Sequence, residues 1–189
     1  MQPTDHAAVA PTAPGKHSSF GFVDTAPVLA ALAVADQVLD LGCGAGDWSL
    51  ALASAGTPVL AIDRWRAGLA WLSRHGQGLP LLALEAELGA PLPVAGGAAG
   101  GVLLSLALHH LVTSGVAPRL LAEVSRVLRP GGILAVVEFL PVPRPPGPPL
   151  AVRLSPQQVL ALTADAGLLD PAVQPIADHV ALYRLRKPR

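Results

Sequence analysis

The sequence predicts a single α/β domain, doubly wound around a mostly parallel sheet with helices on both faces. Short apolar runs of strand length alternate with longer segments whose apolar residues recur at helical spacing. Strands that alternate with helices need crossover connections, and these crossovers place the strands parallel to one another. The chain has 189 residues, of which 51% are hydrophobic. It is therefore long enough for one domain with a substantial core and too short for two ordinary domains.

The expected elements are placed by their apolar spacing and by the glycines and prolines between them. A helix is expected from Asp24, which can cap it. The tail from about residue 171 to 185 is expected to form two antiparallel strands around a turn marked by Pro175 and Asp178. The sheet then has seven strands, with an antiparallel C-terminal strand. The other expected strands are residues 38–41, 59–62, 81–84, 102–106 and 133–139, and the other helices are 47–55, 64–75, 116–128 and 155–166.

Charge and composition exclude several classes of protein. Thirteen basic and thirteen acidic residues give a formal net charge of zero, whereas a protein that grips phosphates usually has a basic surplus, so no nucleic-acid partner is expected. The single cysteine, Cys43, excludes an intramolecular disulfide. The N-terminus lacks a signal-peptide pattern, and the longest apolar run, residues 102–108, is far shorter than the roughly 20 residues that span a bilayer. We therefore expect a cytoplasmic protein with no membrane partner.

The most informative segment is the glycine-rich loop after the first strand. Gly42, Gly44 and Gly46 stand at alternate positions between a buried strand and a helix. Glycines let the chain turn sharply and let a ligand approach the backbone, and the helix N-terminus offers free N–H groups. A dinucleotide-binding loop needs its third glycine one residue later, where this chain has Asp47, and no P-loop Gly-Lys-Ser/Thr follows. Asp63, at the end of the second strand, is placed to accept hydrogen bonds from a ribose.

Four segments in this order resemble the class I S-adenosylmethionine-dependent methyltransferases, in particular the small ubiquinone/menaquinone-biosynthesis type. The segments are residues 38–46, 61–63, 104–111 and 123–134, and the similarity covers roughly residues 37–186. The resemblance implies a Rossmann-like fold and transfer of a methyl group from S-adenosylmethionine to a small-molecule acceptor. The acceptor atom and the oligomeric state stay open. No metal is expected, because the six histidines show no spacing typical of metal ligands.

The resemblance also implies roles for particular residues. Asp40 and the glycine backbone would hold the methionine end of the cofactor, Asp63 the ribose, and Arg64 would flank the adenine. Glu85 takes the place where an Asp is more usual near the adenine amino group, and backbone groups at Ala86 share this work. The full set of expected cofactor-binding residues is Asp40, Gly42, Cys43, Gly44, Gly46, Asp63, Arg64, Glu85, Ala86, Glu87 and Ser105.

The chain departs from the family pattern in two places. Relatives often have Phe-Asp before the fourth strand, where this chain has Ala99-Gly100-Gly101, and the loop at residues 88–98 differs in composition. We expect these changes to affect the rim of the adenine pocket. The chain also lacks a large insertion before the last helix, which in relatives covers the substrate.

His109 and His110, just past the fourth strand, are candidates for a general base. Packing or shaping of the pocket mouth is the alternative role. Residues 1–23 are expected to form a flexible tail or a lid, with Phe20 and Phe22 over the cofactor, and residues 24–189 the single domain. Trp48 is expected mainly to pack.

Three other functions remain open at this point. A non-catalytic protein that binds S-adenosylmethionine or S-adenosylhomocysteine as a regulator or partner would fit the departures. A nicotinamide oxidoreductase is disfavoured by the glycine spacing, and a nucleic-acid or protein methyltransferase by the neutral charge.

Overall fold

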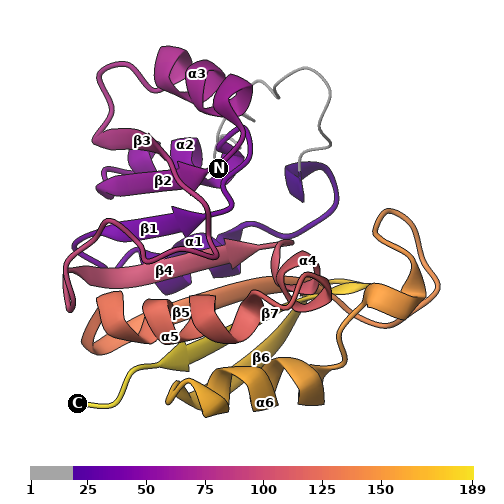
Figure 1. Cartoon of the computed structure of the whole chain (residues 1–189). Helices are drawn as coiled ribbons and strands as arrows, with labels where there is room; N and C mark the ends of the chain where they lie inside the picture. Colours follow the sequence, from indigo (N-terminus) through magenta and orange to yellow (C-terminus); the bar gives the residue numbers. More distant parts are fainter. Residues whose placement is uncertain (1–18) are drawn as a thin grey trace, which may run out of the picture.

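The computed structural model describes residues 19–189. A seven-stranded sheet runs through the middle of the molecule with helices on both faces (Figure 1), as the sequence predicts. The strands are β1 (Val38–Leu41), β2 (Val59–Asp63), β3 (Leu81–Glu85), β4 (Ala99–Ser105), β5 (Leu128–Phe139), β6 (Leu169–Ala177) and β7 (Val180–Arg186). The α-helices are α1 (Ala26–Leu32), α2 (Asp47–Ser54), α3 (Arg66–His75), α4 (Leu108–Thr113), α5 (Ala117–Val127) and α6 (Pro156–Asp165), and two 3₁₀ turns are η1 (Ser19–Gly21) and η2 (Leu150–Val152).

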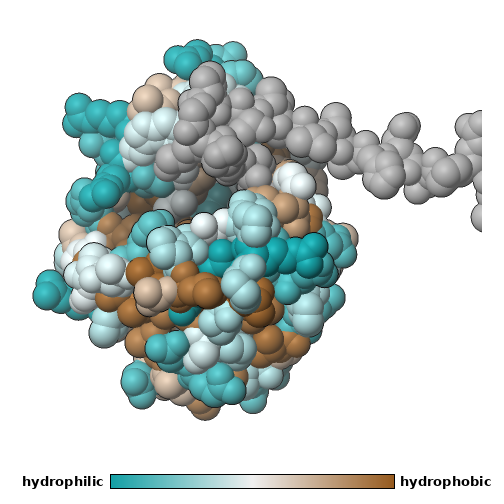
Figure 2. Space-filling model, turned by 90° about the vertical axis from the view of Figure 1, so that its right-hand side faces the viewer, coloured by the Kyte–Doolittle hydropathy of each residue, from teal (hydrophilic) through white to brown (hydrophobic). Residues whose placement is uncertain are grey.

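The strand order is β3-β2-β1-β4-β5-β7-β6. Strands β1 to β5 pair in parallel, whereas β7 is antiparallel to both β5 and β6. The order reverses between β1 and β4, and the crevice beyond the carboxyl ends of strands at such a reversal is where open α/β sheets bind ligands. Figure 2 looks onto this edge of the sheet, where apolar and polar surface lie side by side.

Apolar cores on both faces of the sheet hold the helices against it. Side chains of β5 alternate between them: Leu134 and Val136 face the core under α5 and α6, whereas Ala135 and Val137 face the core under α1 and α2. A strand covered on both faces needs apolar side chains in both directions, which is why these strands are continuous apolar runs in the sequence.

Several elements differ from the sequence-based expectation. Helix α4 was not predicted, since it is only six residues long and follows its strand directly. Helix α3 begins at Arg66 rather than Arg64, because Asp63 accepts the N–H of Trp65 and caps the turn before it. Pro175 lies within β6, so the expected turn there is wrong; the turn is at Asp178 and His179.

The Ala99-Gly100-Gly101 departure lies at the amino end of β4, on the opposite edge of the sheet from the expected cofactor site. Both glycine N–H groups donate to the carbonyl of Gln37, and a Cβ on Gly100 would lie 2.4 Å from Asp36 Oδ1. The expectation that this departure affects the adenine rim is therefore wrong. The two glycines instead allow the connection between α1 and β1 to lie close to β4.

The outer strand β6 is exposed along most of its length and carries Pro171 and Pro175. Its pairing with β7 is irregular between Leu169 and Ala172 and again between Pro175 and Ala177. Prolines are tolerated here because an edge strand does not need every N–H for its ladder.

The expected tail or lid falls partly outside the described residues, since residues 1–18 are not described. From residue 19 the chain packs on the domain: Phe20 contacts Trp48 edge-on, with ring centroids 4.6 Å apart, and Phe22 stacks on Phe139 at 6.1 Å. The N–H of Asp24 donates to the carbonyl of Ile176. No helix in residues 19–189 is long and apolar enough to cross a membrane.

Candidate active site

The glycine loop connects β1 to α2 in a conformation that only glycine adopts readily. Gly42, Gly44 and Gly46 have φ of 73°, 61° and 84°. The N–H groups of Gly42 and Cys43 both donate to the carbonyl of Ile62, which ties the loop to the end of β2. The loop is thereby held above the carboxyl ends of the strands, and a ligand can approach it closely because its glycines have no side chains.

A glycine that the sequence analysis did not single out supports this loop from below. Gly68 is buried on α3, and a Cβ there would lie 2.5 Å from the carbonyl oxygen of Gly44. Helix α3 can therefore approach the loop only because residue 68 has no side chain. The sequence does not indicate this role of Gly68, because a glycine within a helical segment gives no information about which distant residues pack against it.

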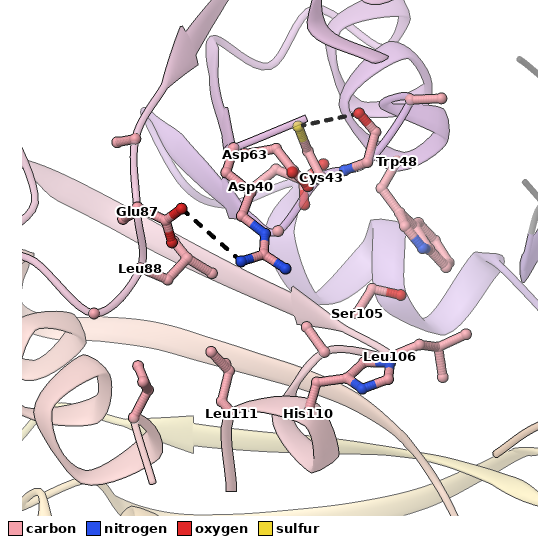
Figure 3. Close-up of a pocket in the computed structure, with 18 of the residues that line it drawn as sticks. Asp40, Cys43, Trp48, Asp63, Glu87, Leu88, Ser105, Leu106, His110 and Leu111 are labelled. Atoms are coloured by element: carbon pink, nitrogen blue, oxygen red, sulfur yellow. Dashed lines mark hydrogen bonds and ion pairs between the residues drawn. The ribbon is translucent and has the colours of Figure 1, made fainter. Parts of the chain in front are cut away.

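A pocket of about 740 Å³ lies between this loop and α4 (Figure 3). Its volume falls in the range typical of small-molecule sites. The residues that line it include Asp40, Gly42, Cys43, Gly44, Asp47, Trp48, Asp63, Arg64, Ala86, Glu87, Leu88, Ser105, Leu106, His110, Leu111 and Val116.

Asp63 connects the loop to the second strand. Its Oδ2 accepts the N–H of Gly44 at 2.7 Å, and its Oδ1 accepts the N–H of Trp65 at 2.8 Å. A carboxylate has about four acceptor positions, so both oxygens can still accept hydrogen bonds from ligand hydroxyls. The same residue thus shapes the loop and presents acceptors to the pocket.

Asp40 lies at the floor of the pocket and is 1% exposed. Burial raises its pKa to about 7, and the nearby negative charges of Asp63 and Asp47 add to the rise. The hydroxyl of Ser49 donates to Asp40 Oδ2 at 2.5 Å and opposes it. A cationic ligand group beside Asp40 would favour its ionised form. The pocket floor therefore suits a positively charged ligand.

Two polar atoms on the pocket wall are buried without a hydrogen-bond partner in the described part of the chain. They are Oδ1 of Asp47 and the indole Nε1 of Trp48. An unpaired buried polar atom costs about 1–3 kcal/mol, so such atoms are uncommon unless a ligand satisfies them.

The structure brings most of the expected cofactor-binding residues together around the pocket. Gly46 and Glu85 are the exceptions. Gly46 lies behind the loop as the N-cap of α2, and Glu85 points to Arg66, whose Nε donates to it at 2.6 Å. Glu87, unlike Glu85, lines the pocket, and at one end of it forms an exposed ion pair with Arg64 at 3.9 Å (Figure 3).

The two histidine candidates have different environments. His109 is buried; its backbone N–H and its Nδ1 contact the two oxygens of Glu138, at 3.0 and 2.8 Å. His110 is exposed and lines the pocket from α4. Its ring lies 4.1 Å from the ring of His109. Only His110 can reach a ligand, whereas the His109–Glu138 pair joins α4 to β5.

Sequence reasoning missed the apolar wall of the pocket. Leu88, Leu106, Leu111 and Val116 line it and are only half-buried. Leu106 has φ of 52°, a left-handed conformation that is uncommon for a residue with a branched side chain. Nothing in the local pattern distinguishes these residues from core leucines, because their exposure depends on where α4 and the loop before β4 come to lie.

A comparison with known protein families identifies the family of this chain. Residues 39–136 match the family model described as a methyltransferase domain. This range covers more than half of the chain. The chain belongs to this methyltransferase family. The resemblance drawn from the four sequence segments is thereby confirmed.

Curated relatives in this family match the chain over part of their length. The demethylmenaquinone methyltransferase of Parafrankia sp. is 37% identical over 135 residues, covering 61% of this chain and 51% of the relative. An uncharacterized methyltransferase of Synechocystis sp. is 34% identical over 109 residues, covering 58% of this chain and 50% of the relative. The chain thus spans about half the length of the curated relatives it matches.

Solved structures show the same fold. An S-adenosylmethionine-dependent methyltransferase from Aquifex aeolicus superimposes with a TM-score of 0.78 at 22% identity, covering 88% of this chain and 90% of that chain. Another from Mesorhizobium loti gives a TM-score of 0.69 at 20% identity, covering 86% and 97%. The Rossmann-like doubly wound fold expected from the sequence is therefore confirmed.

Proposed function

We propose that this methyltransferase-family chain binds S-adenosylmethionine in the pocket above β1 and β2 and transfers its methyl group to a small-molecule acceptor. The observation that carries the proposal is the pocket itself, where a glycine loop and three carboxylates, Asp40, Asp47 and Asp63, surround one cavity. S-adenosylmethionine has a positively charged sulfonium, an ammonium group and a ribose diol, and each of these is favoured by a nearby carboxylate.

The residues contribute mainly by positioning. Bound S-adenosylmethionine supplies an activated methyl group, and its displacement needs the acceptor atom in line with sulfur and methyl. Asp63 would hold the ribose, and Asp40 the ammonium group. Ser105 and Leu106, at the end of β4, lie between Asp40 and Asp63 on one side and His110 on the other (Figure 3). The acceptor is therefore expected at the His110 side of the pocket.

The acceptor is proposed to be an apolar ring compound of the quinone class. The half-buried leucines Leu106 and Leu111 flank His110 and offer apolar contact. Two relatives named demethylmenaquinone methyltransferase are similar to this chain, one 37% identical over 135 residues and the other 34% identical over 119 residues. The assay is the formation of S-adenosylhomocysteine with reduced demethylmenaquinone as the acceptor. Turnover supports this acceptor class, whereas cofactor binding without turnover on any quinol contradicts it.

Calorimetric titration with S-adenosylmethionine and, separately, S-adenosylhomocysteine tests cofactor binding. We expect saturable binding of both, and at least tenfold weaker binding in Asp63→Ala, because charged hydrogen bonds to the ligand are lost. Asp165→Ala is the matched control, since Asp165 is exposed at the end of α6. Thermal melting of both variants verifies folding, because Asp63 also holds Gly44. Absence of binding to the unmodified protein would remove the proposed function.

His110→Ala is expected to lower kcat about a hundredfold while leaving affinity for S-adenosylhomocysteine unchanged. A positioned general base contributes at least this much when the acceptor must lose a proton. His75→Ala is the control, because His75 is an exposed histidine that stacks on Trp71, away from the pocket. An unchanged kcat in His110→Ala would show that the histidine only shapes the pocket.

A further inference from the structure

Three aromatic rings join segments that are far apart in the sequence, at the carboxyl end of β5. The ring of His179, in the turn between β6 and β7, lies 5.9 Å from the ring of Phe139. Phe22 lies 5.7 Å from His179 and also stacks on Phe139. The ring cluster of Phe22, Phe139 and His179 therefore fastens the N-terminal segment, residues 19–25, to β5 and to the β6–β7 hairpin.

A further segment at this cluster is the proline-rich segment, residues 141–149, which contains six prolines and extends beyond the carboxyl edge of the sheet (Figure 1). Arg153 is buried and holds this segment from the inside. Its guanidinium donates at 2.7 to 2.9 Å to three carbonyls of the segment, those of Val142, Arg144 and Pro148. The same guanidinium lies 5.3 Å from the centre of the Phe139 ring. A fixed positive charge is therefore buried beside the ring cluster.

His179 is the titratable member of the ring cluster. It is 4% exposed, and neither ring nitrogen has a hydrogen-bond partner in the described part of the chain. Burial lowers its pKa below the ordinary value of 6.5, and the positive charges of Arg153 and Arg144 lower it further. Asp178 and the carbonyl of Pro146 favour the charged ring, but Asp178 is ion-paired with Arg144. The cluster therefore accommodates the neutral ring and disfavours the charged one.

The acidic groups on the other elements around the cluster have partners of their own. Glu138 on β5 accepts hydrogen bonds from His109. Asp24, in the N-terminal segment, is exposed and accepts the N–H of Ala26. Protonation of His179 would place a third positive charge beside the two arginines, and the packing around the ring would have to open to give this charge access to water.

We propose that His179 is a pH-sensitive latch that holds the N-terminal and proline-rich segments on the sheet while it is neutral and releases both when it is protonated. The released ring has the ordinary pKa of about 6.5, which is higher than that of the packed ring. The packed form is therefore favoured above pH 6.5 and becomes less populated as the pH falls below it. Phe20 leaves Trp48 with the N-terminal segment, so the latch also acts on one wall of the pocket. The inference does not depend on the proposed function.

Hydrogen exchange measured by NMR on the ligand-free protein tests the latch. We expect the protection of the N–H groups that fasten the two segments to fall about tenfold from pH 7.5 to pH 5.0, after correction for intrinsic exchange. Val124, in the middle of α5, should lose no protection, because the domain itself stays folded. The reporting N–H groups are those of Asp24, which donates to Ile176, Leu140, which donates to His179, and Val142, which donates to Leu140.

His179→Phe retains an aromatic ring in the cluster and cannot take up a proton, so the fall in protection should disappear. His75→Phe is the matched control, because His75 is exposed on α3 and stacks on Trp71, and the fall should remain in this variant. Arg144→Gln is a second variant for the case that His179→Phe does not fold. It removes one of the two positive charges and leaves Asp178 free to pair with the protonated ring, so the fall should shrink.

Equal protection at the two pH values, or a fall that persists in His179→Phe, would overturn the inference. A fall in only one of the two segments would overturn it as well, because the latch releases both. An equal fall at Val124 would show that the whole domain unfolds and that no latch opens. An NMR titration of the His179 ring with a midpoint at or above pH 6.5 would also contradict the inference.

Discussion

Replacing Asp40 with asparagine is expected to make the protein more stable at pH 8 and to weaken binding of S-adenosylmethionine at least tenfold. The buried carboxyl has its pKa raised from 3.8 to about 7. The folded state therefore binds a proton more tightly than the unfolded chain does. The stability contribution of this group is greatest below pH 3.8 and falls as the pH rises through about 7. At higher pH the buried charge lowers the free energy of unfolding by about 4 kcal/mol, a cost that an amide avoids.

Thermal melting of the unmodified protein and of Asp40→Asn at pH 5 and pH 8 measures this effect. The variant should melt several degrees higher at pH 8, and the difference should shrink towards pH 5. Ser49→Ala serves as a second variant, because it removes the hydrogen bond that lowers the pKa of Asp40 and should destabilise the protein at pH 8. An Asp40→Asn protein that melts lower at pH 8 would show that the carboxylate is stabilising despite its burial.

Because Asp40 titrates near neutral pH, we also expect the affinity of the unmodified protein for its cofactor to depend on pH. An ammonium group beside Asp40 favours the ionised carboxylate, so cofactor binding must release the proton that Asp40 holds below about pH 7. We expect affinity for S-adenosylhomocysteine to be about tenfold lower at pH 5.5 than at pH 7.5, and to be flat over this range in Asp40→Asn. A flat profile in the unmodified protein would contradict the assignment of Asp40 to the ammonium group.

Gly46→Ala is expected to destabilise the protein by about 2–5 kcal/mol, through left-handed backbone strain and crowding. Gly46 has φ of 84°, and a Cβ there would lie 2.5 Å from Leu72 on α3. Gly56 is the matched control: its φ is 88°, but a Cβ there meets nothing within 4 Å. Gly56→Ala should lower the free energy of unfolding only through backbone strain, by about 1–2 kcal/mol.

Denaturant unfolding of Gly46→Ala and Gly56→Ala separates the two contributions. Their difference reports the crowding against Leu72 alone, because both positions need the same left-handed backbone. Equal losses in the two variants would mean that Leu72 moves aside at little cost. In that case the third glycine of the loop is required for its backbone angle and not for the packing of α2 on α3.

The sequence predicts the parts of this fold whose cause is local. The strand expected at residues 38–41 and the helix expected over residues 155–166 match the structure closely. The strand is an apolar run that ends at a glycine, and the helix follows Ser155 with Gln158 three residues later, so both have local sequence signals. The placement of Asp63 at the glycine loop was predictable for a related reason, since parallel strands end on the same edge of the sheet.

Features that depend on packing between distant segments were not predictable. The requirement for Gly68 comes from the carbonyl of Gly44, 24 residues earlier in the chain. The separation of His109 from the pocket comes from Glu138 on β5. The unpaired atoms of Asp47 and Trp48 are properties of a cavity, and no spacing in the sequence encodes them.

The prolines of β6 have a consequence for how copies of this chain can associate. An open sheet edge invites strands of other molecules to continue the sheet, which leads to aggregation. Pro171 and Pro175 each lack an N–H, and the two irregular stretches of the β6–β7 pairing lie at these residues. A strand from another copy would therefore meet an interrupted hydrogen-bonding register at this edge. We expect concentrated solutions of the protein to resist edge-to-edge growth through β6, so any specific self-assembly would use another surface.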